Sequence, residues 1–141
     1  MIVLFDTNVV LDVLLDREPF SDDSADALSR VEKGDIRGLV CATTVTTLHY
    51  LCRKVLGRGR TQRELRVLVS IVDVAAVNRG VIDAALASKI GDFEDAVLVA
   101  SGESAGADAI VTRNKRDFAA ARIAVYTPAE LLALLDGNGV D

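Results

Sequence analysis

Short apolar runs alternate along this chain with longer amphipathic segments, and that alternation limits the possible folds more than any other feature. The apolar runs predicted to form strands are residues 2–5, 39–42, 71–77, 109–111 and 123–126. Between them, apolar side chains recur every three or four positions, which indicates helices. Because consecutive parallel strands need a crossover connection, the sequence predicts an α/β fold: a three-layer α/β/α sandwich with a central, mainly parallel five-stranded sheet.

Several polar residues predict where helices begin. Ser21 and Asn78 are residue types that cap helix N-termini, and each precedes an amphipathic segment. Thr61 and Thr127 are each followed three residues later by a glutamate, which is the spacing of a capping box. We therefore expect helices to start at these four positions.

The size and composition of the chain fit one domain. It has 141 residues, of which 50% are hydrophobic, so we expect a single domain over residues 1–141. No apolar stretch approaches the roughly 20 residues that cross a bilayer. The first strand lacks a basic lead and runs directly into Asp6, unlike a secretory signal. We expect a cytoplasmic protein that makes no membrane contact.

Cysteine and histidine are too scarce to suggest a zinc site. Cys41 and Cys52 are not part of a CxxC motif, and His49 is the single histidine. We expect the two thiols to be buried and the imidazole to be half-buried. Neither GxxxxGK[ST] nor GxGxxG occurs, so the sequence gives no support to nucleoside triphosphate or dinucleotide chemistry. Any catalysis must therefore use carboxylates.

Carboxylates occur where a parallel sheet forms its sites, beyond the ends of strands. Asp6 follows the first strand, Asp92 to Asp95 open a helix, and Asp117 lies in the loop after the fourth strand. Alone, each has an ordinary explanation as a helix cap or turn residue. If they converge, their repulsion requires a cation, and oxygen ligands without His or Cys select Mg²⁺ or Mn²⁺. Such an ion can activate water to hydrolyse a phosphodiester.

Three segments, in this order along the chain, resemble the motifs of the PIN-domain family: Asp6-Thr7-Asn8-Val9-Val10-Leu11-Asp12, Asp92-Phe93-Glu94-Asp95-Ala96 and Ile110 to Phe118. The resemblance covers essentially the whole chain. It implies a magnesium- or manganese-dependent ribonuclease that hydrolyses RNA phosphodiester bonds, of the kind found as the toxin in VapBC-type toxin–antitoxin pairs. It also implies a homodimer and a cognate antitoxin protein that blocks the acidic pocket.

The resemblance assigns roles to individual residues. Asp6, Asp95 and Asp117 match the catalytic and metal-binding acids of the family. Further positions match additional or orienting groups: Asp92, Asn114, Thr112 and Asn8. One position departs from the pattern, because Thr47 stands where the family commonly has Glu. That loss should weaken metal binding and slow hydrolysis, unless Asp92 or Glu94 compensates.

Other interpretations compete with an active nuclease. A catalytically impaired PIN domain would act as an RNA- or protein-binding module. The haloacid-dehalogenase-like phosphatases also place an Asp after the first strand, but the second acid of their DxD signature is Asn8 in this chain. A phosphoacceptor receiver domain would need a lysine after the fifth strand, where the sequence has Thr127-Pro128.

Charge is distributed unevenly along the chain. The formal net charge of −5 argues against a protein that coats nucleic acid through bulk positive charge. Between Arg53 and Arg66, however, the only acid is Glu64 and basic residues dominate. This segment is either a solvated helical hairpin or a groove wall that holds phosphates. For the second interpretation, the expected nucleic-acid-binding residues are Arg58, Arg60 and Arg63.

Overall fold

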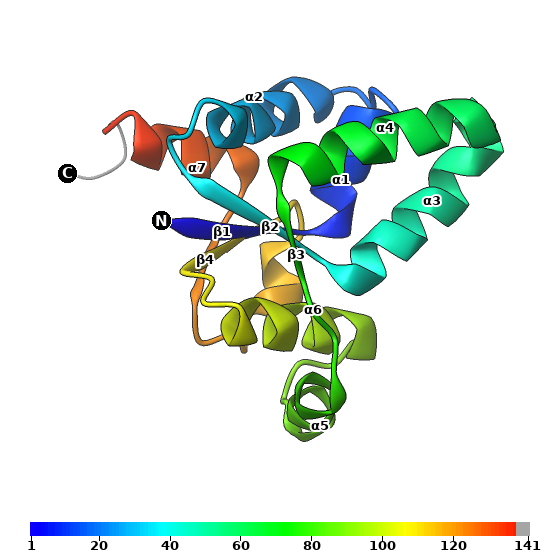
Figure 1. The fold of residues 1–141 in the computed structure, drawn as a ribbon. Coiled ribbons are helices and arrows are strands. Elements are labelled where there is room, and N and C mark those ends of the chain that lie inside the picture. Colours follow the sequence, from blue (N-terminus) through cyan, green and yellow to red (C-terminus); the bar gives the residue numbers. More distant parts are fainter. Residues whose placement is uncertain (138–141) are drawn as a thin grey trace.

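The computed structural model describes residues 1–137, and their five strands form one parallel sheet between two layers of helices (Figure 1). The strands are β1 (Ile2–Phe5), β2 (Arg37–Cys41), β3 (Asp73–Ala75), β4 (Ala109–Val111) and β5 (Ala124–Tyr126). Their order in space is β3-β2-β1-β4-β5, and every neighbouring pair is parallel. The predicted α/β/α sandwich is confirmed.

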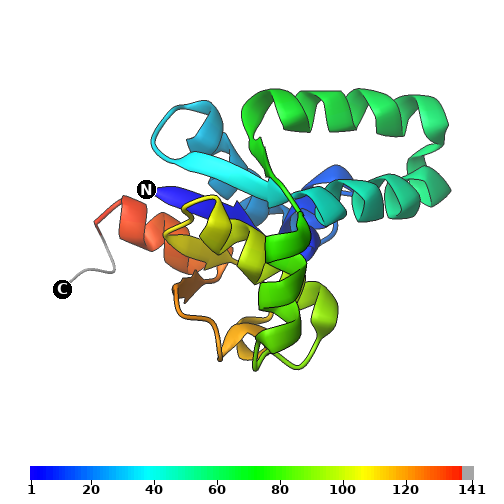
Figure 2. The same cartoon turned by 60° about the horizontal axis from the view of Figure 1, so that its bottom comes forward.

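Helices cover both faces of the sheet. They are α1 (Thr7–Leu14), α2 (Ser21–Glu32), α3 (Ala42–Leu56), α4 (Arg58–Ile71), α5 (Arg79–Ala87), α6 (Phe93–Ser104) and α7 (Pro128–Leu135), with a 3-10 helix at Lys115–Phe118. The first four helices and α7 pack on one face, whereas α5 and α6 pack on the other (Figures 1 and 2). In both views, α3 and α4 form a hairpin that projects beyond the sheet.

The central strand, β1, contributes side chains to two separate cores because its side chains alternate between the two faces of the sheet. Val3 and Phe5 lie in the core under α1 to α4 and α7, while Leu4 lies in the core with α5 and α6. Gly102 brings α6 close to β1, since a Cβ atom there would lie 2.7 Å from Leu4 Cδ2. This contact lets the C-terminal half of α6 pack directly on β1.

Two predicted helix starts and one predicted strand are wrong in detail. Ser21 lies inside the first turn of α2, where its side chain is buried instead of capping the helix. Thr61 lies inside α4, and its hydroxyl donates to the Gly57 carbonyl at 2.7 Å. The hairpin turn at Gly57 lets α4 begin earlier, at Arg58, and α4 continues to Ile71. The third strand is therefore confined to β3.

The second strand also differs from the prediction of residues 39–42, because β2 begins at Arg37 and Ala42 already belongs to α3. The other predicted caps and the predicted burial of cysteine and histidine are confirmed. Asn78 Oδ1 accepts from the Val81 amide at 3.0 Å, and Thr127 forms the predicted capping box at the start of α7. Cys41 and Cys52 are buried free thiols, and His49 is half-buried. Within residues 1–137, no helix combines the length and the apolarity that crossing a bilayer requires.

Candidate functional site

An acidic pocket of about 260 Å³ opens beyond the carboxyl ends of β1 and β4, where the strand order changes direction. Four carboxylates and several neutral polar side chains line it. The carboxylates are Asp6, Glu94, Asp95 and Asp117, and the neutral groups include Asn8, Thr47 and Asn114. The structure thus brings the three acids singled out in the sequence to one pocket, although they come from distant segments.

Asp6 is the most deeply placed of these acids, at 7% exposure. It is also the N-cap of α1, because its Oδ1 accepts from the Thr7 amide at 2.7 Å. Its Oδ2 accepts from the Thr112 hydroxyl at 2.7 Å, and that hydroxyl accepts in turn from the Asn114 amide at 3.0 Å. Burial raises the pKa of Asp6, although these hydrogen bonds oppose the rise. The carboxylate is therefore fixed in place by the fold.

Asp95 has the most perturbed ionisation in the acidic pocket. Burial, followed by repulsion from Asp6, Asp92, Asp117 and Glu94, raises its pKa to about 7. The exposed Asp92 is the N-cap of α6, where its Oδ1 accepts from the Asp95 amide at 2.9 Å. Asp92 does not itself line the acidic pocket. Its contact with Asp95 is thus made through the backbone of the helix start.

Glu94 enters the acidic pocket beside Thr47. The Thr47 hydroxyl donates to Glu94 Oε1 at 3.4 Å, and both residues line the pocket. Spacing in the sequence left open whether Asp92 or Glu94 faces this position, and the structure brings Glu94 there. A carboxylate from α6 therefore lies next to the neutral residue of α3.

The donor atoms of the acidic pocket suit a hard cation. They are carboxylate, amide and hydroxyl oxygens, and Asn8 Oδ1 is buried there without a hydrogen-bond partner among the described residues. Across residues 1–137, no three His, Cys, Asp or Glu side chains approach closely enough to enclose one ion. Mg²⁺ needs only one or two direct carboxylates because it retains several waters. The donor set fits Mg²⁺ or Mn²⁺ held partly through water.

A buried ion cluster behind the acidic pocket was missed by the sequence reasoning. Asp12 is fully buried and accepts from Arg113 at 2.6 and 3.2 Å and from Arg17 at 2.8 Å. Arg113 directly precedes Asn114, so the cluster anchors the loop that enters the pocket. The signal was present, because a carboxylate inside the apolar run of α1 must find a cationic partner when it is buried.

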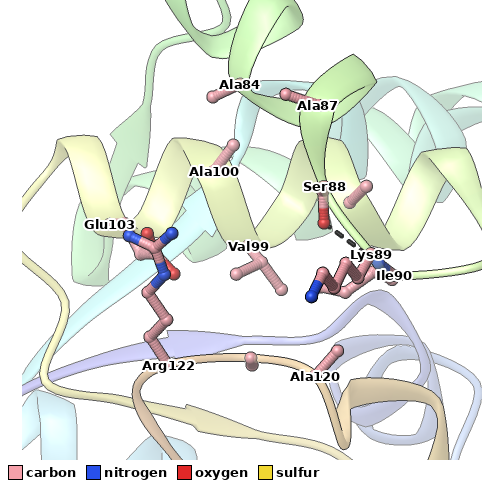
Figure 3. A pocket seen from close by; sticks show the side chains of 12 residues that line it. Ala84, Ala87, Ser88, Lys89, Ile90, Val99, Ala100, Glu103, Ala120 and Arg122 are labelled. Atoms are coloured by element: carbon pink, nitrogen blue, oxygen red, sulfur yellow. Dashed lines mark hydrogen bonds between the residues drawn. The ribbon is translucent and has the colours of Figure 1, made fainter.

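A larger cavity, about 450 Å³, lies between α5, α6 and the segment after the 3-10 helix (Figure 3). Half of its lining residues are alanines, and Lys89, Glu103 and Arg122 are its charged residues. The dashed line in Figure 3 is the Ser88 hydroxyl accepting from the Ile90 amide at 3.1 Å. None of the predicted site residues lines this cavity, so it is not the candidate for hydrolysis.

The basic segment forms the hairpin of α3 and α4. Its six basic side chains are exposed: Arg53, Lys54, Arg58, Arg60, Arg63 and Arg66. Within residues 1–137 they form no ion pair with an acid, although Lys54 lies over the Tyr50 ring at 4.2 Å. The same hairpin reaches the acidic pocket at Thr43 and Thr47, near the start of α3. Its charge is therefore available to a ligand.

Solved structures share this fold. VapBC2 from Rickettsia felis, bound to a DNA fragment from its promoter, matches with a TM-score of 0.69 and 15% identity over 90% of this chain and 98% of that chain. A toxin–antitoxin complex from Klebsiella pneumoniae matches with a TM-score of 0.68 and 23% identity over 89% and 97%. VapBC-1 from nontypeable Haemophilus influenzae gives 0.67 and 15% over 92% and 99%.

At these identities the structural matches show the fold alone. No curated protein matches the sequence significantly. The family model of the PIN domain matches residues 2–116, which is most of the chain. The chain therefore belongs to the PIN-domain family.

Proposed function

We propose that the acidic pocket is the active site of a ribonuclease that depends on Mg²⁺ or Mn²⁺, and that the chain is the toxin of a toxin–antitoxin pair. The observation that carries the proposal is the meeting of Asp6, Asp95 and Asp117 in one pocket at the switch point of the sheet. Membership of the PIN-domain family supports it, as do fold neighbours that are toxin–antitoxin complexes.

Each acid has a distinct part in this proposal. A bound dication would polarise a phosphoryl oxygen and favour ionisation of an attacking water. Asp6, held by Thr112 and by the Thr7 amide, supplies a carboxylate whose position is fixed before the ion arrives. Asp95 would supply a second carboxylate, and because its pKa is raised to about 7, a cation that binds there would compete with a proton near neutral pH. Asp117 is exposed at the mouth, where it adds charge while remaining accessible to solvent.

Glu94 supplies the charge that Thr47 lacks. The hydroxyl of Thr47 holds the Glu94 carboxylate in the acidic pocket at 3.4 Å, so a fourth acid is present although α3 provides none. Glu94→Gln should therefore weaken Mn²⁺ binding. Adding Thr47→Glu to that variant should restore it, because the new carboxylate would enter the pocket from the opposite wall.

The basic hairpin gives the proposed RNA substrate a second contact. Thr47 lies nine residues before the end of α3 at Leu56, roughly 14 Å along the helix, and Arg58, Arg60 and Arg63 follow in the first two turns of α4. A single RNA strand can therefore contact both the arginines and the acidic pocket. The acids of the acidic pocket repel the phosphates of RNA. The three arginines attract these phosphates and so favour RNA binding.

The partners in this proposal are a cognate antitoxin and a second copy of the chain. The hairpin exposes Val55 and Val67 at 67% and 57%, in addition to its cations. These side chains give the two helices of the hairpin apolar surface that a second protein chain could cover. We assign the homodimer contact to this hairpin, which light scattering after gel filtration tests directly.

A catalytically impaired binding module is the second candidate. Two observations favour it: the neutral Thr47, and the absence from residues 1–137 of three carboxylates close enough to enclose one ion. Both candidates predict RNA binding, but only the nuclease predicts turnover that depends on a metal.

RNA cleavage with purified protein separates the two candidates. The wild type should cut single-stranded or structured RNA when Mg²⁺ or Mn²⁺ is added and should be silent in EDTA. Asp6→Asn and Asp95→Asn should fold but show no RNA cleavage. Asp26→Asn, the same chemical change at an exposed site on α2, should cleave RNA as wild type does. Cleavage that persists in both site variants would reveal a contaminant or a different site.

A further inference from the structure

A second pocket lies directly beside the acidic pocket, and the two share Asn114. We call it the Phe20 pocket; its volume is about 370 Å³, within the range of small-molecule sites. It lies between the start of α2, the loop after β4 and the start of α7. The lining residues that matter here are Pro19, Phe20, Ser24, Arg113 and Pro128. A ligand that enters the acidic pocket therefore passes next to this surface.

One wall of the Phe20 pocket is a fixed aromatic surface. Phe20 is 40% exposed and lies in the wall of the pocket, so part of its ring is open to a ligand. Arg113 stacks on its ring, with Cζ 4.0 Å from the centroid. Arg113 is itself held by both oxygens of the buried Asp12. The ring is thus oriented before any ligand arrives, and Pro19 extends the apolar wall beside it.

The floor of the Phe20 pocket has an unsatisfied polar group. Ser24 lines the pocket at 0% exposure, and its Oγ has no hydrogen-bond partner among the described residues. A buried hydroxyl without a partner is unfavourable, so few are found in folded proteins. The Oγ is closed to solvent, so a ligand in the pocket would satisfy it only after the Ser24 side chain rotates toward the pocket. Flat apolar faces combined with polar edges are the chemistry of a nucleobase.

The charges around the aromatic wall nearly cancel, unlike those of the acidic pocket. Asp12 is paired with the guanidinium groups of Arg17 and Arg113, and Asp23, which lines the Phe20 pocket, offsets the remaining positive charge. The acidic pocket, a few residues away across Asn114, is where the proposed function puts the reacting phosphate. A base would therefore lie on the aromatic wall of the Phe20 pocket while the phosphate attached to it lies in the adjacent acidic pocket.

We propose that the Phe20 pocket binds an unpaired nucleobase of the RNA strand, next to the phosphodiester that the acidic pocket hydrolyses. This inference rests on the proposed ribonuclease function and adds to it a specificity site. A base enters such a pocket only when it is unstacked and unpaired, so cleavage is directed to single-stranded loops and ends. Phe20 supplies the stacking surface, and Ser24 adds a hydrogen bond to the edge of the base once its side chain has turned toward the pocket.

The test combines a protein variant with a missing base. Cleavage of a short labelled RNA in Mn²⁺ is measured as kcat/KM for the wild type, for Phe20→Leu and for Ser24→Ala. The same RNA is then made abasic at each nucleotide around the cut in turn. Leu86→Ala, which removes an exposed apolar side chain from α5, is the control. Circular dichroism melting of each variant reports whether it is folded.

For the wild type, kcat/KM should fall roughly 5- to 100-fold on the RNA that is abasic at one position beside the cut, because base–aromatic stacking has about this size. Phe20→Leu should show a loss of that order on intact RNA and no further loss on the abasic RNA. The base site is overturned if folded Phe20→Leu cleaves intact RNA as fast as wild type does. It is also overturned if kcat/KM of this variant falls on abasic RNA by the same factor as that of wild type. Neither result affects the proposed ribonuclease function. No cleavage by wild type with either metal overturns the proposed function, and the base site falls with it.

Discussion

Replacing Asp95 by asparagine should stabilise the metal-free protein above neutral pH. The pKa of Asp95 is raised from 3.8 to about 7, so the folded state binds a proton more tightly than the unfolded chain does. The free energy of unfolding therefore falls as pH rises from about 4 to 7, and the destabilisation is complete above pH 7. The asparagine side chain cannot ionise, so the Asp95→Asn variant escapes this penalty.

The magnitude follows from the size of the shift. Three pKa units correspond to about 4 kcal/mol at about 1.36 kcal/mol each. Asp95 is partly exposed, so solvent and salt screen its neighbours, and we expect about half, or about 2 kcal/mol, at pH 8. At pH 5 only about a third of the effect should remain, because the folded carboxyl is already protonated there. The gain at pH 8 corresponds to a rise in Tm of roughly 6–8 °C for a chain of this length.

The assay is urea unfolding in EDTA at pH 5 and pH 8, followed by circular dichroism. Asp26→Asn on the exposed side of α2 is the matched control and should change the free energy of unfolding by less than about 0.5 kcal/mol at both values. Equal stability of Asp95→Asn and wild type at pH 8 would refute the reasoning, since it would mean that neither burial nor the surrounding acids disfavour the charged form of this carboxylate.

Three further predictions concern the ion cluster, the hairpin and the metal. Asp12→Ala should lower the free energy of unfolding by about 2–3 kcal/mol in urea unfolding, because it removes the charged hydrogen-bond partner of the partly buried Arg113 and Arg17; a change below about 1 kcal/mol would contradict this. Replacing Arg58, Arg60 and Arg63 by glutamine should reduce the slope of log affinity for single-stranded RNA against log salt by about 2, because each phosphate contact contributes about 0.7. An unchanged slope would mean that the hairpin is solvated or forms the dimer contact and does not bind RNA phosphates. Mg²⁺ affinity, measured by calorimetry, should rise by up to about tenfold per pH unit until pH 7 and then level off, because the ion displaces the proton of Asp95; affinity independent of pH would count against that competition.

The fold was predictable because its signal is local and repeated. Each strand of the sheet is a short apolar run, and its alternating side chains supply both cores, so the period of the pattern is preserved in the structure. The failures occur where tertiary packing outweighs a local preference. Ser21 is a good capping residue, yet burial of its side chain places it inside the helix. Thr61 does not cap α4, because the tight turn at Gly57 lets the helix begin three residues earlier, at Arg58.

The position of the acids was predictable, but their environment was not. Asp6 and Asp117 follow strands whose carboxyl ends must meet in a parallel sheet, and this rule is enough to bring them together. The contact of Glu94 with Thr47 depends on how α6 lies against α3, which spacing does not determine. The pairing of Asp12 with Arg113 joins residues 101 positions apart, so only the fold reveals it.

Binding of Mn²⁺ tests the central claim most directly, because Mn²⁺ in solution gives an electron paramagnetic resonance signal that is lost when the ion binds the protein. Titration of wild type at a pH slightly above neutral should remove the free-ion signal saturably. Asp6→Asn and Asp95→Asn should bind roughly tenfold more weakly or worse, the size of effect that loss of a metal-site group commonly has, while Asp26→Asn should match wild type. Equal binding by all four proteins, or no binding by any, would contradict an ion shared by the acids of this pocket.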